Sequence, residues 1–126
     1  MKSIYSLIAI ILSFFCFFTG GNPGGVTISL AEIPTTESDT VTVVIKNYSG
    51  VSITVDKSVV LEKEENGKWV TVPTADGFGF EETAVKIRNC GSLTIKINII
   101  EAYGHKLEKG IYRITKDNMS SGVFEI

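Results

Sequence analysis

Histidine and cysteine are scarce in this chain, and their scarcity excludes most kinds of active site. The 126 residues include one histidine, His105, and two cysteines, Cys16 and Cys90. A multi-histidine metal site, or a zinc site with paired Cys and His ligands, needs more of these residues at a defined spacing. The one nucleophile and base pair left to consider is Cys90 with His105, and no catalytic motif surrounds Cys90. The sequence therefore predicts a protein without catalytic activity, bound metal or cofactor.

Cysteine is also too rare for a disulfide framework. Cys16 lies in an N-terminal segment that we expect to be removed, which leaves Cys90 alone in the mature chain. Cys90 lies among turn-forming residues, so its thiol is expected to be exposed. The fold must then be stabilised by packing, and pairing of Cys90 between chains remains an alternative to an unpaired thiol.

Positive charge is not concentrated in any part of the chain. The formal net charge is −2, with 12 Lys and Arg against 14 Asp and Glu, and the two signs are interspersed. Nucleic acids and anionic membranes bind clustered Lys and Arg. We therefore expect no nucleic-acid partner.

The longest apolar run lies at the N-terminus. Lys2 precedes apolar residues 7–18, and small residues 19–21 follow. A transmembrane helix needs about 20 apolar residues, and this run is shorter. A basic start, a short apolar core and small residues predict a signal peptide over residues 1–21, cleaved after Gly21. The alternative is an uncleaved N-terminal anchor, which would be the one contact of this chain with a membrane.

The remaining residues, 22–126, are enough for one domain with its own core and too few for two. Export through a signal peptide would make this domain secreted or place it at the cell surface.

Helical periodicity is missing from this domain. Apolar residues alternate with polar ones at period two, and none of the segments shows the spacing i, i+3, i+4, i+7 of an amphipathic helix. The predicted strands cover residues 26–30, 40–46, 51–55, 59–64, 68–72, 84–88, 93–99, 111–116 and 123–126. Short strands separated by turn residues predict two antiparallel sheets packed face to face, an all-β sandwich.

Two of these strands form a predicted hairpin around Asn66-Gly67. The pair separates residues 59–64 from residues 68–72. Both residues tolerate positive φ, which a tight two-residue turn requires. Residues 73–82 follow the hairpin as a predicted loop.

Gly110 and Tyr112 form a motif at the start of the strand over residues 111–116. A Tyr that opens a strand, two residues after a Gly, is typical of the tyrosine corner of immunoglobulin-like sandwiches. We expect the Tyr112 hydroxyl to donate to a backbone carbonyl a few residues upstream, and Gly110→Val to be at least as destabilising as Tyr112→Phe if Gly110 has a positive φ. The motif has a structural role, and it favours a Greek-key topology.

Residues 41–116 resemble the bacterial immunoglobulin-like domains of secreted and surface proteins of low-GC Gram-positive bacteria. The most specific features are Leu61-Glu62-Lys63, followed by Asn66-Gly67-Lys68-Trp69, and the later run Gly110-Ile111-Tyr112-Arg113-Ile114. The resemblance implies an immunoglobulin-like β-sandwich that presents or spaces something at the cell exterior. It names no ligand.

The chain departs from antibody-type domains, which carry a disulfide between their sheets and bury a Trp beside it. Here Val43 or Ile45 and Ile114 occupy the bridge positions, and Trp69 lies in the hairpin. The sandwich is therefore expected to lack a disulfide, with Trp69 covering the core from a different strand.

The loop over residues 73–82 contains Gly77-Phe78-Gly79-Phe80, the one candidate contact with a partner. Aromatic residues dominate protein interfaces, and loops on a rigid sandwich commonly carry binding sites. The alternative is that Phe80 closes the end of the core and the glycines only let the chain turn.

These observations favour an exported, non-enzymatic immunoglobulin-like module with a binding or structural role, whose partner is an unidentified protein or cell-surface ligand. The alternative from another class is an inhibitor of extracellular enzymes such as proteases. Titration against secreted hydrolases distinguishes the two, because an inhibitor reduces their activity stoichiometrically.

Overall fold

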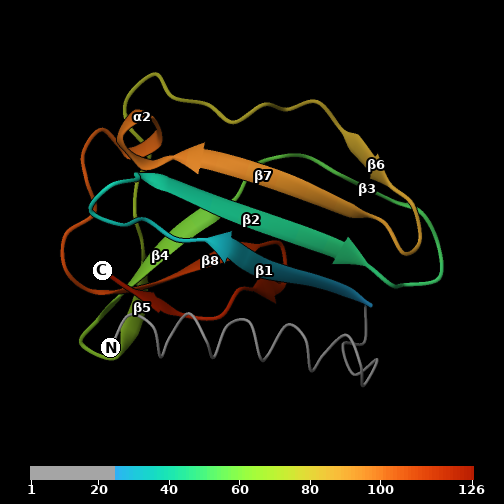
Figure 1. The fold of residues 1–126 in the computed structure, drawn as a ribbon, viewed down its shortest axis with the longest axis horizontal. Helices are drawn as coiled ribbons and strands as arrows, with labels where there is room; N and C mark the ends of the chain where they lie inside the picture. The colour runs from blue at the N-terminus through green and yellow to red at the C-terminus, as the bar shows by residue number, and fades with distance from the viewer. Residues whose placement is uncertain (1–24) are drawn as a thin grey trace.

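The computed structural model describes residues 25–126, which fold into two packed antiparallel sheets (Figure 1). The predicted signal peptide over residues 1–21 lies outside the described residues. The first sheet has the order β1 (Val26–Glu32), β2 (Thr40–Asn47) and β7 (Ser92–Asn98). The second has the order β10 (Phe124–Glu125), β8 (Ile111–Lys116), β4 (Val60–Glu65) and β5 (Lys68–Thr71), with β9 (Met119–Ser120) paired to β8.

A third, two-stranded sheet pairs β3 (Ile53–Val55) with β6 (Val85–Ile87). It lies beyond one end of β7, as Figure 1 shows at the right of the molecule. The chain crosses repeatedly between the two larger sheets, so the all-β immunoglobulin-like sandwich predicted from the sequence is confirmed. None of the helices in the described part has the length and apolarity to cross a membrane.

The core lies between the two larger sheets and follows the predicted alternation. Val41, Val43 and Ile45 of β2 are fully buried, and they face Leu61 of β4 and Ile114 of β8. Apolar side chains thus fill the positions where antibody-type domains have a disulfide. No disulfide is present among the described residues, and Cys90 is an exposed free thiol.

The hairpin between β4 and β5 is confirmed. Glu65 pairs with Lys68, so the turn has two residues. Asn66 and Gly67 have φ values of 54° and 78°, which is the positive-φ pair that this type of turn requires.

One short helix, α2 (Ile99–Tyr103), corrects the prediction that residues 22–126 contain no helix. It follows directly on β7. The Asn98 side chain accepts a hydrogen bond from the Glu101 N–H at its start, and Gly104 ends it in a left-handed conformation with φ 84°. Five residues are too few for the periodicity that identifies a helix in a sequence, although Ile99, Ala102 and Tyr103 form a buried face.

Tyr112 makes the hydrogen bond that the tyrosine-corner motif predicts. Its hydroxyl donates to the Glu108 carbonyl oxygen at 2.7 Å, and its ring is buried and stacks on Phe124. Burial raises the pKa of this hydroxyl to about 12, with the nearby Glu108 and Glu65 carboxylates adding to the effect. The bond fastens the connection from α2 to the start of β8.

Tyr112→Phe is expected to lower the free energy of unfolding by about 1 kcal/mol, because it deletes this bond and keeps the ring. Tyr103→Phe is the matched control. The Tyr103 hydroxyl is buried without a hydrogen-bond partner in the described structure, so its removal should leave stability unchanged or increase it. Urea unfolding of both variants measures the two effects. Equal losses of stability would contradict the assigned hydrogen bond.

Gly110 does not have a positive φ, so the condition for a strained substitution there is not met. Positive φ among the described glycines occurs at other positions. The Gly110 N–H and carbonyl instead pair with the backbone of Ile126, at 3.3 and 2.9 Å. A Cβ at this position would lie 2.7 Å from Cε of Lys63, which belongs to a flexible side chain that can move. Strain from a left-handed conformation therefore does not explain this glycine.

Trp69 does not cover the core, contrary to the prediction. It lies opposite Glu64, on the face of the second sheet that points away from the first. Its ring packs under the guanidinium of Arg113, 4.3 Å from the ring centre, and Arg113 Nε donates to Glu62 at 2.7 Å. Trp69 thus stabilises the outer face of this sheet through a cation–π contact.

A buried lysine links the end of β8 to the loop after β3. Lys116 is 5% exposed, and its Nζ lies 2.6 Å from Oδ1 of Asp56. The same carboxylate accepts hydrogen bonds from the Ser58 hydroxyl and N–H. Lys116 first, and then the Ser58 donors, hold the pKa of Asp56 well below its usual range.

This depressed pKa predicts a pH dependence of stability. The Asp56 carboxylate contributes stability above the pKa of about 3.9 of an unfolded Asp, and the contribution is lost as the pH falls toward the lower pKa of the folded state. The difference in urea midpoint between the wild type and Asp56→Asn should therefore be constant above pH 5 and shrink between pH 4 and pH 2. Asp76→Asn, in an exposed loop, is the control. An unchanged difference for Asp56→Asn down to pH 2 would contradict the assignment.

Candidate functional site

The two residues considered for catalysis lie at opposite ends of a strand. Cys90 is exposed in the turn between β6 and β7, and His105 is exposed just after α2. The length of β7 separates these two segments (Figure 1). Within residues 25–126, no three His, Cys, Asp or Glu side chains gather as potential metal ligands. The structure does not assemble the Cys90 and His105 pair.

The predicted contact residues Phe78 and Phe80 lie on the loop that runs along the edge of β7 away from β2. Both are partly buried and pack against the core. Their rings meet edge to face at 86°, with centres 5.1 Å apart. They therefore form an aromatic pair at the rim of the core. This position is intermediate between the two alternatives that the sequence allowed, a contact with a partner and a side chain that closes the end of the core. Neither is a freely projecting side chain.

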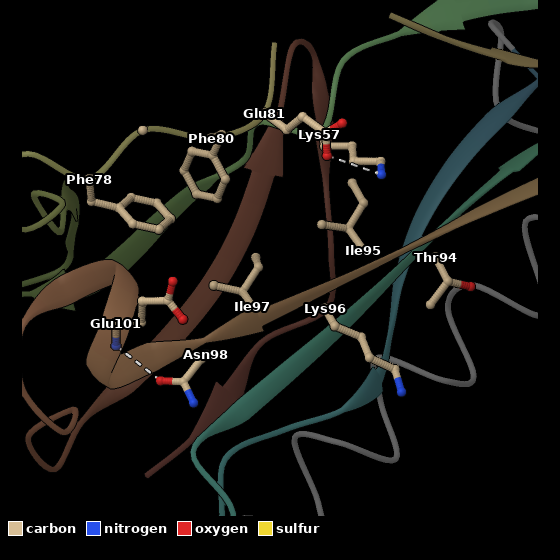
Figure 2. Close-up of a pocket in the computed structure, with 11 residues that line it drawn as sticks. Lys57, Phe78, Phe80, Glu81, Thr94, Ile95, Lys96, Ile97, Asn98 and Glu101 are labelled. Carbon is tan, nitrogen blue, oxygen red and sulfur yellow. Dashed lines mark hydrogen bonds and ion pairs between the residues drawn. The ribbon is translucent and has the colours of Figure 1, made fainter. Parts of the chain in front are cut away.

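A pocket of about 280 Å³ lies between this aromatic pair and β7. Residues 78–81 line one side, and residues 94–98 of β7 line the other. Figure 2 shows Ile95 and Ile97 on the side of the strand that faces the aromatic rings, with Thr94, Lys96 and Asn98 pointing away from them. The Lys57–Glu81 ion pair, at 3.4 Å, lies at one end, and Glu101 of α2 lies at the other.

The pocket is bounded by the edge of a sheet. β7 pairs with β2 on one side, and within residues 25–126 no strand pairs with its other side. The Ile99 N–H donates to Asp39 and the Gly91 carbonyl accepts from Asn47, so odd-numbered residues of β7 direct their backbone groups toward β2. Thr94 and Lys96 must then direct theirs outward, because the direction alternates along an antiparallel strand.

Comparison with models of known protein families identifies the family to which this chain belongs. A family model described as a bacterial Ig-like domain matches residues 22–124, most of the chain. The chain belongs to this bacterial Ig-like domain family. No curated protein matches it.

The sheet edge is the part of this Ig-like domain that the sequence analysis missed. Sequence patterning predicted the strand over residues 93–99 and its inward face, but it did not show which neighbours the strand has. The available signal was Lys96 in the middle of a strong β-forming run, because lysine on an edge strand discourages uncontrolled pairing. A second signal was the weak strand pattern of residues 73–84, which precede β6, because a segment that does not form a strand cannot pair with β7.

Proposed function

We propose that this bacterial Ig-like domain is an exported, non-enzymatic binding module at the cell exterior, and that its partner contacts the segment carrying Phe78 and Phe80. The observation that carries the proposal is the pocket between this aromatic pair and the unpaired edge of β7. It combines an apolar wall with unused backbone hydrogen-bonding groups, the two features that bind extended protein segments. A rigid sandwich holds both sides in place.

Two further observations support this proposal. Bacterial Ig-like domains commonly occur in surface or secreted proteins, and the family is typically non-catalytic. The described part of the chain does not bring Cys90 and His105 together and gathers no cluster of metal ligands. A binding function requires none of these groups.

Cell fractionation tests the export that the proposal requires. The full chain, with a C-terminal epitope tag, is expressed in its native host and followed in the cytosol, the cell envelope and the medium. We expect it in the envelope or the medium, with an N-terminus at residue 22 where the signal peptide is cleaved. Intact chain confined to the cytosol would overturn the proposal, and a known cytosolic enzyme controls for lysis.

The position of Phe78 gives a stability prediction that bears on this contact. Phe78→Ala should lower the free energy of unfolding by about 1–2 kcal/mol, between the effects of a surface change and of a core cavity, because the ring is half-buried against Phe80. Val51→Ala, at an exposed position away from the pocket, is the control and should have little effect. Urea unfolding provides the measurement. A loss of 3 kcal/mol or more would show that Phe78 is a core residue and would withdraw it as a contact.

A further inference from the structure

The edge of β7 offers a defined set of backbone groups to an added strand. Thr94 and Lys96 direct their N–H and carbonyl groups into the pocket, away from β2. An extended segment that pairs with both residues spans at least three residues, because successive outward-facing positions lie two residues apart. Lys57 with Glu81 lies at one end of this edge, and α2 lies at the other.

The side chains beside the edge specify what such a segment would carry. On the inner side the pocket is lined by Phe80, which is partly buried, and by Ile95 and Ile97, which are 5% and 4% exposed (Figure 2). On the outer side, Lys96 is exposed at the middle of the edge and forms no ion pair among the described residues. Directly opposite positions on paired strands lie about 5 Å apart, where opposite charges attract. An alternating segment with apolar residues inward and an acidic residue opposite Lys96 fits both sides.

A second copy of this chain is a poorer occupant of the same edge. β7 carries no acidic residue, so pairing two copies gives Lys96 no opposite charge: antiparallel pairing centred on Ile95, the middle of β7, places Lys96 opposite Thr94, and pairing centred on Lys96 places it opposite Lys96. Like charges directly opposite each other destabilise a strand pair. Lysine at the middle of an edge strand is a common means of preventing such self-association.

We propose that the edge of β7 binds an extended acidic segment of a partner protein by strand addition, with apolar residues of that segment against Phe80 and Ile97. This inference rests on the proposed function as a binding module and names the chemistry of the partner. Specificity comes from the alternation of the segment and from the charge at Lys96. The backbone pairing supplies the affinity.

Peptide selection tests this inference directly. A phage-displayed library of random twelve-residue peptides is selected against the full chain. The enriched peptides are synthesised with a fluorescent label. We expect sequences in which apolar residues alternate with polar residues and include Glu or Asp. Fluorescence anisotropy should show binding about tenfold weaker or worse for Lys96→Glu. Lys46→Glu, an exposed lysine on the same face of β2, should leave binding unchanged.

Methylation of the peptide backbone separates strand addition from a general charge effect. N-methyl groups on the amides that face β7 should abolish binding, whereas N-methyl groups on the alternate amides should leave it largely intact. This comparison leaves the protein unaltered and so does not depend on the folding of a variant. Equal sensitivity of both sets would overturn the inference.

Other results would also overturn the inference. Failure to enrich any alternating acidic peptide would do so, as would peptides that bind Lys96→Glu as well as the wild type. Dimerisation that increases with concentration in sedimentation, and is strengthened by the neutral substitution Lys96→Ala, would assign the edge to a second copy. Each of these outcomes leaves the proposed export intact, because cell fractionation tests that property separately.

Discussion

Replacing Phe124 with alanine is expected to lower the free energy of unfolding by about 3–5 kcal/mol. Phe124 is 0% exposed, although it lies in the two-residue strand β10, two residues before Ile126. Its ring stacks on Tyr112 with the centres 5.7 Å apart and an angle of 23° between the planes. Removal of the ring leaves a cavity beside the tyrosine corner that the packed sheets cannot fully close.

Urea unfolding measured by far-UV circular dichroism provides the test. Phe124→Leu is the matched variant, because it keeps most of the apolar volume and should cost less than about 1.5 kcal/mol. Should the alanine variant not fold, the leucine variant still reports on the site. A loss below about 1 kcal/mol for Phe124→Ala would mean that β10 does not close the core.

Asn47→Ala is expected to lower the free energy of unfolding by about 3 kcal/mol, because several polar groups lose their partner at once. Asn47 is 0% exposed. Its Nδ2 donates to the Val51 carbonyl at 2.8 Å and to the Ile87 carbonyl at 3.0 Å. Its Oδ1 accepts from the N–H and the hydroxyl of Ser49. One side chain thus joins the end of β2 to the turn after it and to β6.

Asn89→Ala is the matched control from the same corner. Asn89 is exposed, and its Oδ1 accepts one hydrogen bond, from the Gly50 N–H at 2.9 Å. Its loss should cost no more than about 1 kcal/mol. Similar losses for the two variants would contradict a central role for Asn47. Amide hydrogen exchange should also show faster exchange in β3 and β6 of Asn47→Ala than in β4 and β8.

Asn47 also bears on the candidate site. Its bond to Ile87 ties β6 to the end of β2, and its bond to Val51 ties the segment before β3 to the same point, while β3 and β6 pair with each other. A sandwich in which β6 paired with β7 would have no open edge there. Asn47 thus stabilises the corner where β6 pairs with β3 and not with β7.

The outward position of Trp69 followed from information already present in the sequence. The Asn66-Gly67 turn has two residues, so Glu64 must lie opposite Trp69. Leu61 points inward, and alternation then directs Glu64 and its partner outward. The prediction that Trp69 covers the core was wrong because it was made by comparison with antibody-type domains, which bury a tryptophan. It did not use the register of the hairpin.

Helix α2 and Gly110 could not be predicted in the same way. A helix of five residues presents little more than one turn, and its burial depends on where the sandwich places it. The backbone of Gly110 adopts its conformation because it pairs with Ile126, a partner that only the closed fold brings near. Both features depend on contacts between segments far apart in the chain.

The sequence by itself determined most of the strands, their inward faces, the turn at Asn66-Gly67 and the donor role of Tyr112, but it did not show β9, which lies where it predicted a turn. These features depend on local periodicity and on the φ preferences of individual residues. The tertiary structure alone decided that β6 pairs with β3, that one edge of β7 has no paired strand among residues 25–126, and that Phe78 and Phe80 stand beside it. Alternation specifies the two faces of a strand and leaves its edges unspecified, because every strand has the same backbone groups and only closure of the whole fold determines which of them are paired.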